Sequence, residues 1–307
     1  MEANEAYWRK MPSVKRLVFK SVPEPTTRAA MLKKGEVDIA YLLDTPAALE
    51  LKRDPSLTLA FSGAIGIHFL DFFDQWDPKS PWHDRRVRLA ANYAIDRQSL
   101  NEAENLGASR LTGSHGPAQV RVRAAPRALS LRSREGEAAA GRGGLPERVR
   151  RRGLLPVSPY FSMGEAVAGN LAAVGIKTKI ITMERAAFQA AWLSKKLRGV
   201  CFCVHAPYGN AASRMAQFVP SNGDFARGAD PDVDALFKQQ ARETDRKKRE
   251  AMLHQIQQLL YERVRFGPIW EYIWPSGIGP RVADPALMKI DPYPWSAPYE
   301  DVTLKRR

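Results

Sequence analysis

The sequence predicts an α/β protein on three observations. Alternating apolar residues in Ile176–Thr182 and the apolar run Val200–Val204 each predict a strand. An amphipathic stretch, Glu184–Lys196, predicts a helix between them. A strand–helix–strand unit of this kind implies parallel pairing and a right-handed crossover. Apolar residues make up 44% of the 307 residues, enough for a packed core, and no run of about 18 apolar residues predicts a membrane span.

The first 75 residues predict short strands around one helix. The helix is expected over Arg28–Lys34, with Gly35 as its left-handed stop. A third strand, Phe61–Phe73, contains glycines that allow hinge-like backbone angles. The first two strands are expected from the apolar residues Val14, Leu17 and Phe19 and from the segment Val37–Tyr41.

A capped helix is predicted from Asp84 to Arg97. The Asp84 carboxylate can accept hydrogen bonds from the first free amides of the helix, and its charge suits the positive end of the helix dipole. Nothing in the segment is catalytic, so the residues alone predict a packed amphipathic helix with a structural Asp96/Arg97 pair. The apolar stripe of this helix consists of small residues that permit close packing: Val87, Ala90, Ala91 and Ala94.

A helix and its caps are also expected after residue 160. Ser162 and Glu165 have the spacing of a capping box, in which each side chain serves a backbone amide at the start of the helix. This helix is predicted to run to Val174 and to stop at Gly175. Two further helices are predicted, over Pro231–Glu243 and Thr244–Val264.

The string Asp84–Arg97 closely resembles the hallmark of the family 5 extracellular solute-binding proteins, here with one extra Arg. These proteins are the peptide, nickel and sugar receptors of ABC importers. A Tyr-Trp-x-x-x-Pro motif starting at Tyr7, followed by Leu32–Ala40, resembles the same family in the same order. Asp84, Arg88, Asp96 and Arg97 are thereby identified as a structural motif of that family.

The resemblance implies a periplasmic-binding-protein-like fold of the cluster C type, an α/β fold with two lobes that is incomplete in this shorter chain. Hinge strands are expected near Ser62–Phe69 and Gly267–Trp270. The expected division is residues 1–65 for the remainder of lobe I, 66–118 for the start of lobe II, 119–155 for an atypical, disordered tract, 156–268 for the remainder of lobe II, and 269–307 for the return to lobe I and a C-terminal strap.

The resemblance also implies a function, that of the substrate-binding component of an ABC importer. Such a protein holds a peptide, sugar or nickel complex between its lobes and delivers it to a membrane permease. It is a monomer, needs no cofactor, metal or catalytic residue, and works in the periplasm. The start of this chain lacks the layout of a secretion signal, so as written it is expected to stay in the cytoplasm, and as a fragment it is expected to be compromised.

Six residues are candidates to contact a solute. His68 lies in an apolar strand, where a packed core histidine is the commoner role. The aromatic residues are equally suited to the core, although flat rings also give a solute a large contact area. The segment 205–214 resembles a family loop but keeps only its tyrosine and not its aspartates, so no carboxylate clamp for a peptide amine is expected. The candidates are His68, Tyr208, Asn210, Arg214, Trp270 and Tyr272.

The two cysteines, Cys201 and Cys203, are separated by one residue on a predicted strand and therefore share a face. That spacing favours core packing over a disulfide. A zinc site is not expected, because no other cysteine lies nearby.

A net charge of +14 raises the alternative of a basic nucleic-acid-binding protein. Ten Arg and three Glu lie within residues 120–153, so this tract alone accounts for half of the excess. It contains only eight residue types and no aromatic residue for base stacking, and we expect it to be disordered. Its GC-rich codon types suggest the hypothesis of a shifted reading frame restored by about Pro156. An enzyme is the remaining alternative, but no phosphate loop, Gly-x-Ser-x-Gly or His-Glu-x-x-His motif is present.

Overall fold

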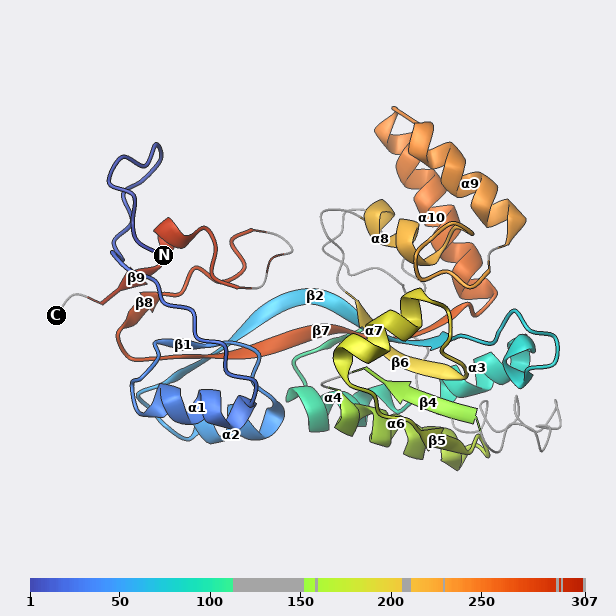
Figure 1. Ribbon diagram of the computed structural model, residues 1–307, viewed down its shortest axis with the longest axis horizontal. Coiled ribbons are helices and arrows are strands. Elements are labelled where there is room, and N and C mark those ends of the chain that lie inside the picture. Colours follow the sequence, from blue (N-terminus) through green and yellow to red (C-terminus); the bar gives the residue numbers. More distant parts are fainter. Residues whose placement is uncertain are drawn as a thin grey trace. The chain divides into compact units, whose positions relative to one another are not determined.

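The computed structural model describes residues 1–112, 152–157, 160–205, 211–228, 230–290, 293 and 295–305, which form two compact units (Figure 1). Unit 1 comprises Met1–Ile65, Asn101–Ser109 and Tyr272–Arg307. Unit 2 comprises Gly66–Leu100 and Arg110–Glu271. Most of the Arg-rich tract lies outside the described residues, and the frameshift hypothesis therefore stays a hypothesis.

Strands β2 (Thr58–Phe72) and β7 (Phe266–Ile278) and helix α4 (Arg97–Asn105) contribute residues to both units. The remaining elements of unit 1 are α1 (Pro25–Lys33), β1 (Ile39–Ala40), α2 (Thr45–Lys52), β8 (Val282–Asp284), the 3₁₀ helix η3 (Tyr299–Asp301) and β9 (Thr303–Leu304). Those of unit 2 are the 3₁₀ helix η1 (Pro81–His83), α3 (Arg85–Ala94), β3 (Arg110–Leu111), β4 (Arg152–Pro156), α6 (Phe161–Ala173), β5 (Thr178–Ile180), α7 (Arg185–Leu193), β6 (Val200–His205), α8 (Ala211–Phe218), α9 (Pro231–Arg242) and α10 (Arg246–Glu262).

The main sheet has the order β1-β7-β2-β6-β4-β5, and β3 also pairs with β7. Strand β6 runs antiparallel to β2, with Ile67 opposite His205 and Phe72 opposite Val200. Strand β4 is parallel to both β5 and β6, so these two strands are parallel to each other. The predicted strand–helix–strand unit is therefore confirmed, with β4 inserted between its two strands.

The position of β4 corrects the predicted boundary of the Arg-rich tract. Composition assigned residues 119–155 to disorder, yet Arg152–Pro156 form a strand in the sheet of unit 2. Leu154 and Leu155 are buried, and strands pair with β4 on both of its edges. A short apolar segment is sufficient to form a strand here because its backbone is hydrogen-bonded to a neighbouring strand on each side.

The hallmark helix α3 has the predicted cap and buried stripe. Asp84 accepts a 2.8 Å hydrogen bond from the amide of Arg86. The two predicted helix stops are also confirmed, because Gly35 and Gly175 adopt the left-handed backbone angles φ 71° and 83°. The stripe residues Val87, Ala90, Ala91 and Ala94 are all buried.

Two local predictions are wrong. Helix α6 starts at Phe161 with no side-chain cap, so Ser162 lies inside the helix and not at its cap position. Residues 14–19 form no strand beyond a single bridge from Arg16 to Glu2. Val18 and Phe19 are 64% and 58% exposed, because no neighbouring strand provides a hydrogen-bonded ladder for this segment.

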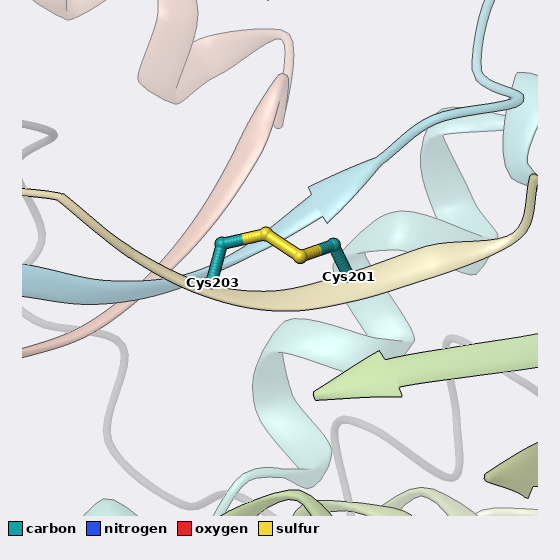
Figure 2. Close-up of a disulfide and its surroundings, with 2 residues drawn as sticks. All are labelled: Cys201 and Cys203. Carbon is teal, nitrogen blue, oxygen red and sulfur yellow. A yellow bond between two sulfur atoms is a disulfide. The ribbon is translucent and has the colours of Figure 1, made fainter. Parts of the chain in front are cut away.

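The prediction for the cysteines is half right. Both are buried in the core of unit 2, as expected, but they are joined by a disulfide (Figure 2). Neighbouring residues on one face of β6 place the two Cα atoms 5.4 Å apart, inside the range that a disulfide can span. The core around this pair includes Ile67, Phe69, Phe73, Leu155, Phe188, Trp192, Phe218 and Ile256.

Candidate functional site

Three aromatic residues alternate along β7, namely Trp270, Tyr272 and Trp274. Alternate residues of a strand point to the same face, so β7 presents a row of rings. Trp270 is fully buried in unit 2, where its ring centre lies 5.8 Å from that of His68. Tyr272 and Trp274 belong to unit 1, with ring centres 5.4 Å apart in an edge-on arrangement.

The rings of β7 continue into the C-terminal part of unit 1. The ring centre of Trp295 lies 5.8 Å from that of Trp274 and 5.2 Å from that of Tyr293. We call Tyr272, Trp274, Trp295 and Tyr293 the aromatic ladder. Tyr272 is buried and Tyr293 is 39% exposed, so the ladder connects the interior of unit 1 to its surface. Aromatic groups arranged in this way can contact a flat or apolar group of a solute with little loss of side-chain entropy.

His68 lies in an aromatic environment in the interior of unit 2. Its ring stacks on Phe202 at 5.0 Å and meets the edge of Tyr160 at 4.7 Å. Burial lowers the pKa of His68 to about 3, so the ring is neutral at neutral pH. In this position His68 packs as a core residue, which is the role that sequence reasoning favoured for an isolated histidine.

Arg214 lies on α8, where its guanidinium is 2.5 Å from Gln217 Oε1 and 5.2 Å from the ring centre of Phe218. Tyr208 and Asn210 fall outside the described residues. Of the six candidates, the structure brings His68 and Trp270 together in unit 2 and places Tyr272 in unit 1.

The hallmark residues have structural partners. Arg88 donates hydrogen bonds to the carbonyls of Val264 and Trp82, and burial lowers its pKa to about 10. Asp96 accepts from the amide and hydroxyl of Ser99. The carboxylate of Asp96 and the guanidinium of Arg97 thus use separate partners and do not serve each other.

An ion pair, Arg110–Glu271, joins β3 to β7 in unit 2. Glu271 is fully buried, whereas about half of the Arg110 side chain is exposed. Sequence reasoning missed this pair, because residues 161 positions apart become neighbours only through strand pairing. The one signal in the sequence was Glu271, a carboxylate within an otherwise apolar and aromatic strand.

Within the described ranges, no three His, Cys, Asp or Glu side chains are grouped so that they could hold a metal ion. The helices in the described ranges also include none that is long and apolar enough to cross a membrane.

Solved structures show the fold of this chain. The chain matches NikA from Brucella suis in complex with Fe(III)-EDTA with a TM-score of 0.84 at 19% identity, over 98% of this chain and 64% of that one. It matches a putative peptide binding protein, AppA, from Clostridium difficile with a TM-score of 0.85 at 16% identity, over 99% and 64%. The fold is therefore the α/β fold of periplasmic binding proteins, represented here in part.

Sequence comparisons then show which family the chain is similar to. Residues 1–120 match the bacterial extracellular solute-binding proteins, family 5 Middle. The chain is 24% identical to Heme-binding protein A of Haemophilus influenzae, over 91% of this chain and 53% of that protein. It is 23% identical to the Nickel-binding periplasmic protein of Escherichia coli, over 87% and 55%. The chain is thus similar to the family 5 extracellular solute-binding proteins, with the family match over residues 1–120, and it spans about half the length of these relatives.

Proposed function

We propose that this chain binds a small solute as part of the substrate-binding component of an ABC importer and delivers it to a membrane permease. The observation that carries the proposal is the aromatic ladder of unit 1, in a chain whose residues 1–120 match a family of solute-binding proteins. Binding of this kind depends on enclosure and contact area and needs no reacting group. We accordingly propose a binding protein and not an enzyme, acting as a monomer.

The chemistry of the ladder favours solutes with a flat or apolar group. Its four side chains carry no charge, and the two tryptophans add an indole N–H donor each. Peptides with apolar side chains and metal complexes with planar ligands both fit this description, and the names of the relatives include heme-, nickel- and di/tripeptide-binding proteins. His68, Trp270, Arg214, Tyr208 and Asn210 stay predicted contact residues, separate from the ladder.

We propose that the protein works outside the cytoplasm. Disulfides persist in oxidising compartments, and Cys201 and Cys203 are joined by one. One relative is named a periplasmic protein, which supports the same location.

The test is a binding screen on the full chain followed by two matched variants. Isothermal titration calorimetry would use di- and tripeptides, a nickel–histidine complex, heme and sugars. Trp295→Ala shortens the ladder at its centre. Trp8→Ala is the control, because Trp8 is also in unit 1 but is 82% exposed and lies outside the ladder.

We expect one solute class to bind saturably, with affinity reduced about tenfold or more by Trp295→Ala, which corresponds to roughly 1.4 kcal/mol, and unchanged by Trp8→Ala. Failure of every class to bind would overturn the proposed function for this chain. Binding that survives Trp295→Ala would overturn the role of the ladder.

A further inference from the structure

Asp71 occupies a core position on β2. It lies between Phe69 and Phe73 on the face of the strand that packs into the apolar core of unit 2, and it is only 5% exposed. Its partner across the sheet is Cys201, on the neighbouring strand β6. A carboxylate at such a position is unfavourable unless it is hydrogen-bonded or neutral. Asp71 therefore needs a physical explanation.

Arg227 is the cation associated with Asp71. Its guanidinium lies 4.3 Å from the ring centre of Phe73, and Nη1 donates to the carbonyl of Lys195 at 2.7 Å. Its Nε and Nη2 atoms are buried and donate to no described residue. No described residue donates a hydrogen bond to the Asp71 carboxylate. A buried acid and a buried base thus both retain unused hydrogen-bonding capacity.

Asp71 and Arg227 line the same small pocket in unit 2. The space that remains for a water-sized sphere is about 20 Å³, which is room for one water molecule and too small for a solute. The other charged residues of its wall are already paired, because Arg265 bonds Asp230 and lies 4.2 Å from the ring centre of Trp76. The pocket therefore offers an unsatisfied acceptor and unsatisfied donors around a space of one water.

We propose that this pocket is a water- and proton-binding site, in which one water accepts a hydrogen bond from Arg227 and donates one to Asp71, and that proton binding there holds residues 219–228 against β2. The segment 219–228 connects α8 to α9 and includes the wall residues Val219 and Phe225–Gly228. When Asp71 carries its proton, the site contains a single charge, that of Arg227. When Asp71 loses the proton, a carboxylate must be kept away from bulk water, and opening of the segment is favoured.

The pKa shifts agree with a segment that is held closed when Asp71 is protonated. Burial raises the pKa of Asp71 to about 7, and the attraction of Arg227 opposes that rise only in part. Burial also lowers the pKa of Arg227. The charges of Asp71 and Asp74 raise this pKa, and the charge of Arg198 lowers it further. Because the folded protein binds the proton more tightly than an unfolded aspartate does, this site stabilises the closed segment most at low pH, and that stabilisation is lost as the pH rises from about 4 to about 7.

The experiment compares wild type with Asp71→Asn, a variant of the same shape that cannot titrate. Hydrogen exchange of residues 219–228 would be measured from pH 5 to 8 and expressed as protection factors, which removes the intrinsic pH dependence of exchange. In the wild type we expect the opening constant of this segment to rise by up to about tenfold per pH unit up to about pH 7 and then to level off. In Asp71→Asn that rise should be absent, and in the control Asp54→Asn, a partly exposed carboxylate of unit 1, it should persist.

Two further measurements test the parts separately. The carboxyl ¹³C signal of Asp71 should titrate near neutrality, and Arg227→Met should move its midpoint upward by removing the opposing cation. A high-resolution crystal structure should show one water in contact with both side chains. A titration midpoint below pH 5, or equal pH dependence in wild type and Asp71→Asn, would overturn the proton site. A dry pocket would overturn the water bridge.

Discussion

Replacement of Arg97 by methionine should destabilise unit 2 through the loss of backbone partners, not of an ion pair. Arg97 is 2% exposed, and its guanidinium donates five hydrogen bonds to neutral oxygens. Two of these run to the carbonyl of Pro268 on β7, at 3.1 and 2.9 Å, and the others serve the end of α3 at Asn92 and Ile95. The single side chain therefore connects α3 to β7.

The size of the destabilisation follows from the backbone carbonyls that lose Arg97 as a donor. Arg97→Met removes the Arg97 donors from the carbonyls of Pro268 and Asn92 inside the protein, at roughly 1–3 kcal/mol each, whereas the Ile95 carbonyl still accepts from the amide of residue 97. Removal of a buried charge, whose pKa burial has already lowered to about 10, offsets part of that loss. We expect a net destabilisation of about 3 kcal/mol. Arg97→Lys should lose nearly as much, because an ammonium group cannot reproduce the planar fork of donors.

The assay is hydrogen exchange by mass spectrometry on peptides that cover α3 and the first half of β7, together with urea unfolding. Arg86→Met is the matched control, because Arg86 lies on α3, the helix that Arg97 contacts, but is exposed and, among the described residues, bonds only Asp84. It should change stability by less than about 1 kcal/mol. A loss below 1 kcal/mol for Arg97→Met, or equal losses for the two variants, would refute the reasoning.

Three further outcomes are expected. Burial lowers the pKa of His68, so the folded wild type excludes a proton that the unfolded chain binds and loses stability as the pH falls from about 6.5 to about 3. His68→Phe should not show this pH-dependent loss, which melting temperatures across the same range would check. Gly199→Ala should lower the free energy of unfolding by at least about 3 kcal/mol, because φ is 89° and a Cβ would lie 2.2 Å from a carbonyl oxygen of β4. Gly169→Ala, on an open helix surface, should raise it by about 0.5–1 kcal/mol in the same melts. Cys201 and Cys203 should be alkylated only after reduction, and alkylation without reductant would contradict the disulfide. Replacement of both by alanine should lose at most about 1–2 kcal/mol of cross-link entropy, because the loop that the disulfide closes is very short.

Local signals in the sequence were sufficient for the Asp84 cap, the two glycine stops and the parallel unit, although not for the capping box expected at Ser162. Asp84, Gly35 and Gly175 act within one turn of their own positions, so their roles depend on residues that are adjacent in sequence. The strands β5 and β6 were recognisable because their pattern and the intervening helix constrain each other. The resemblance of the hallmark string likewise located α3 and its buried stripe.

Features that depend on distant partners were not predictable in the same way. Strand β4 forms inside a compositionally poor tract because β5 and β6 flank it, whereas residues 14–19 form no strand because they make only a single bridge, from Arg16 to Glu2. Asp71 was missed for a related reason, since an aspartate among aromatic residues acquires meaning only when Arg227, 156 positions later, packs beside it. The aromatic ladder needed the same long-range contacts, because Tyr293 and Trp295 lie in a segment that composition describes only as a strap.

The interleaving of unit 1 has a consequence for synthesis. Its residues come from three stretches of the chain, and the last begins at Tyr272, after all of unit 2 has been made. A nascent chain leaving the ribosome therefore has every residue of unit 2 available while unit 1 still lacks the second half of β7 and its C-terminal layer. Translation through residues 272–307 sets the earliest moment at which unit 1 can close its sheet, and a ribosome-stalled chain ending at residue 271 should protect unit 2 from protease while leaving residues 1–65 open to cleavage.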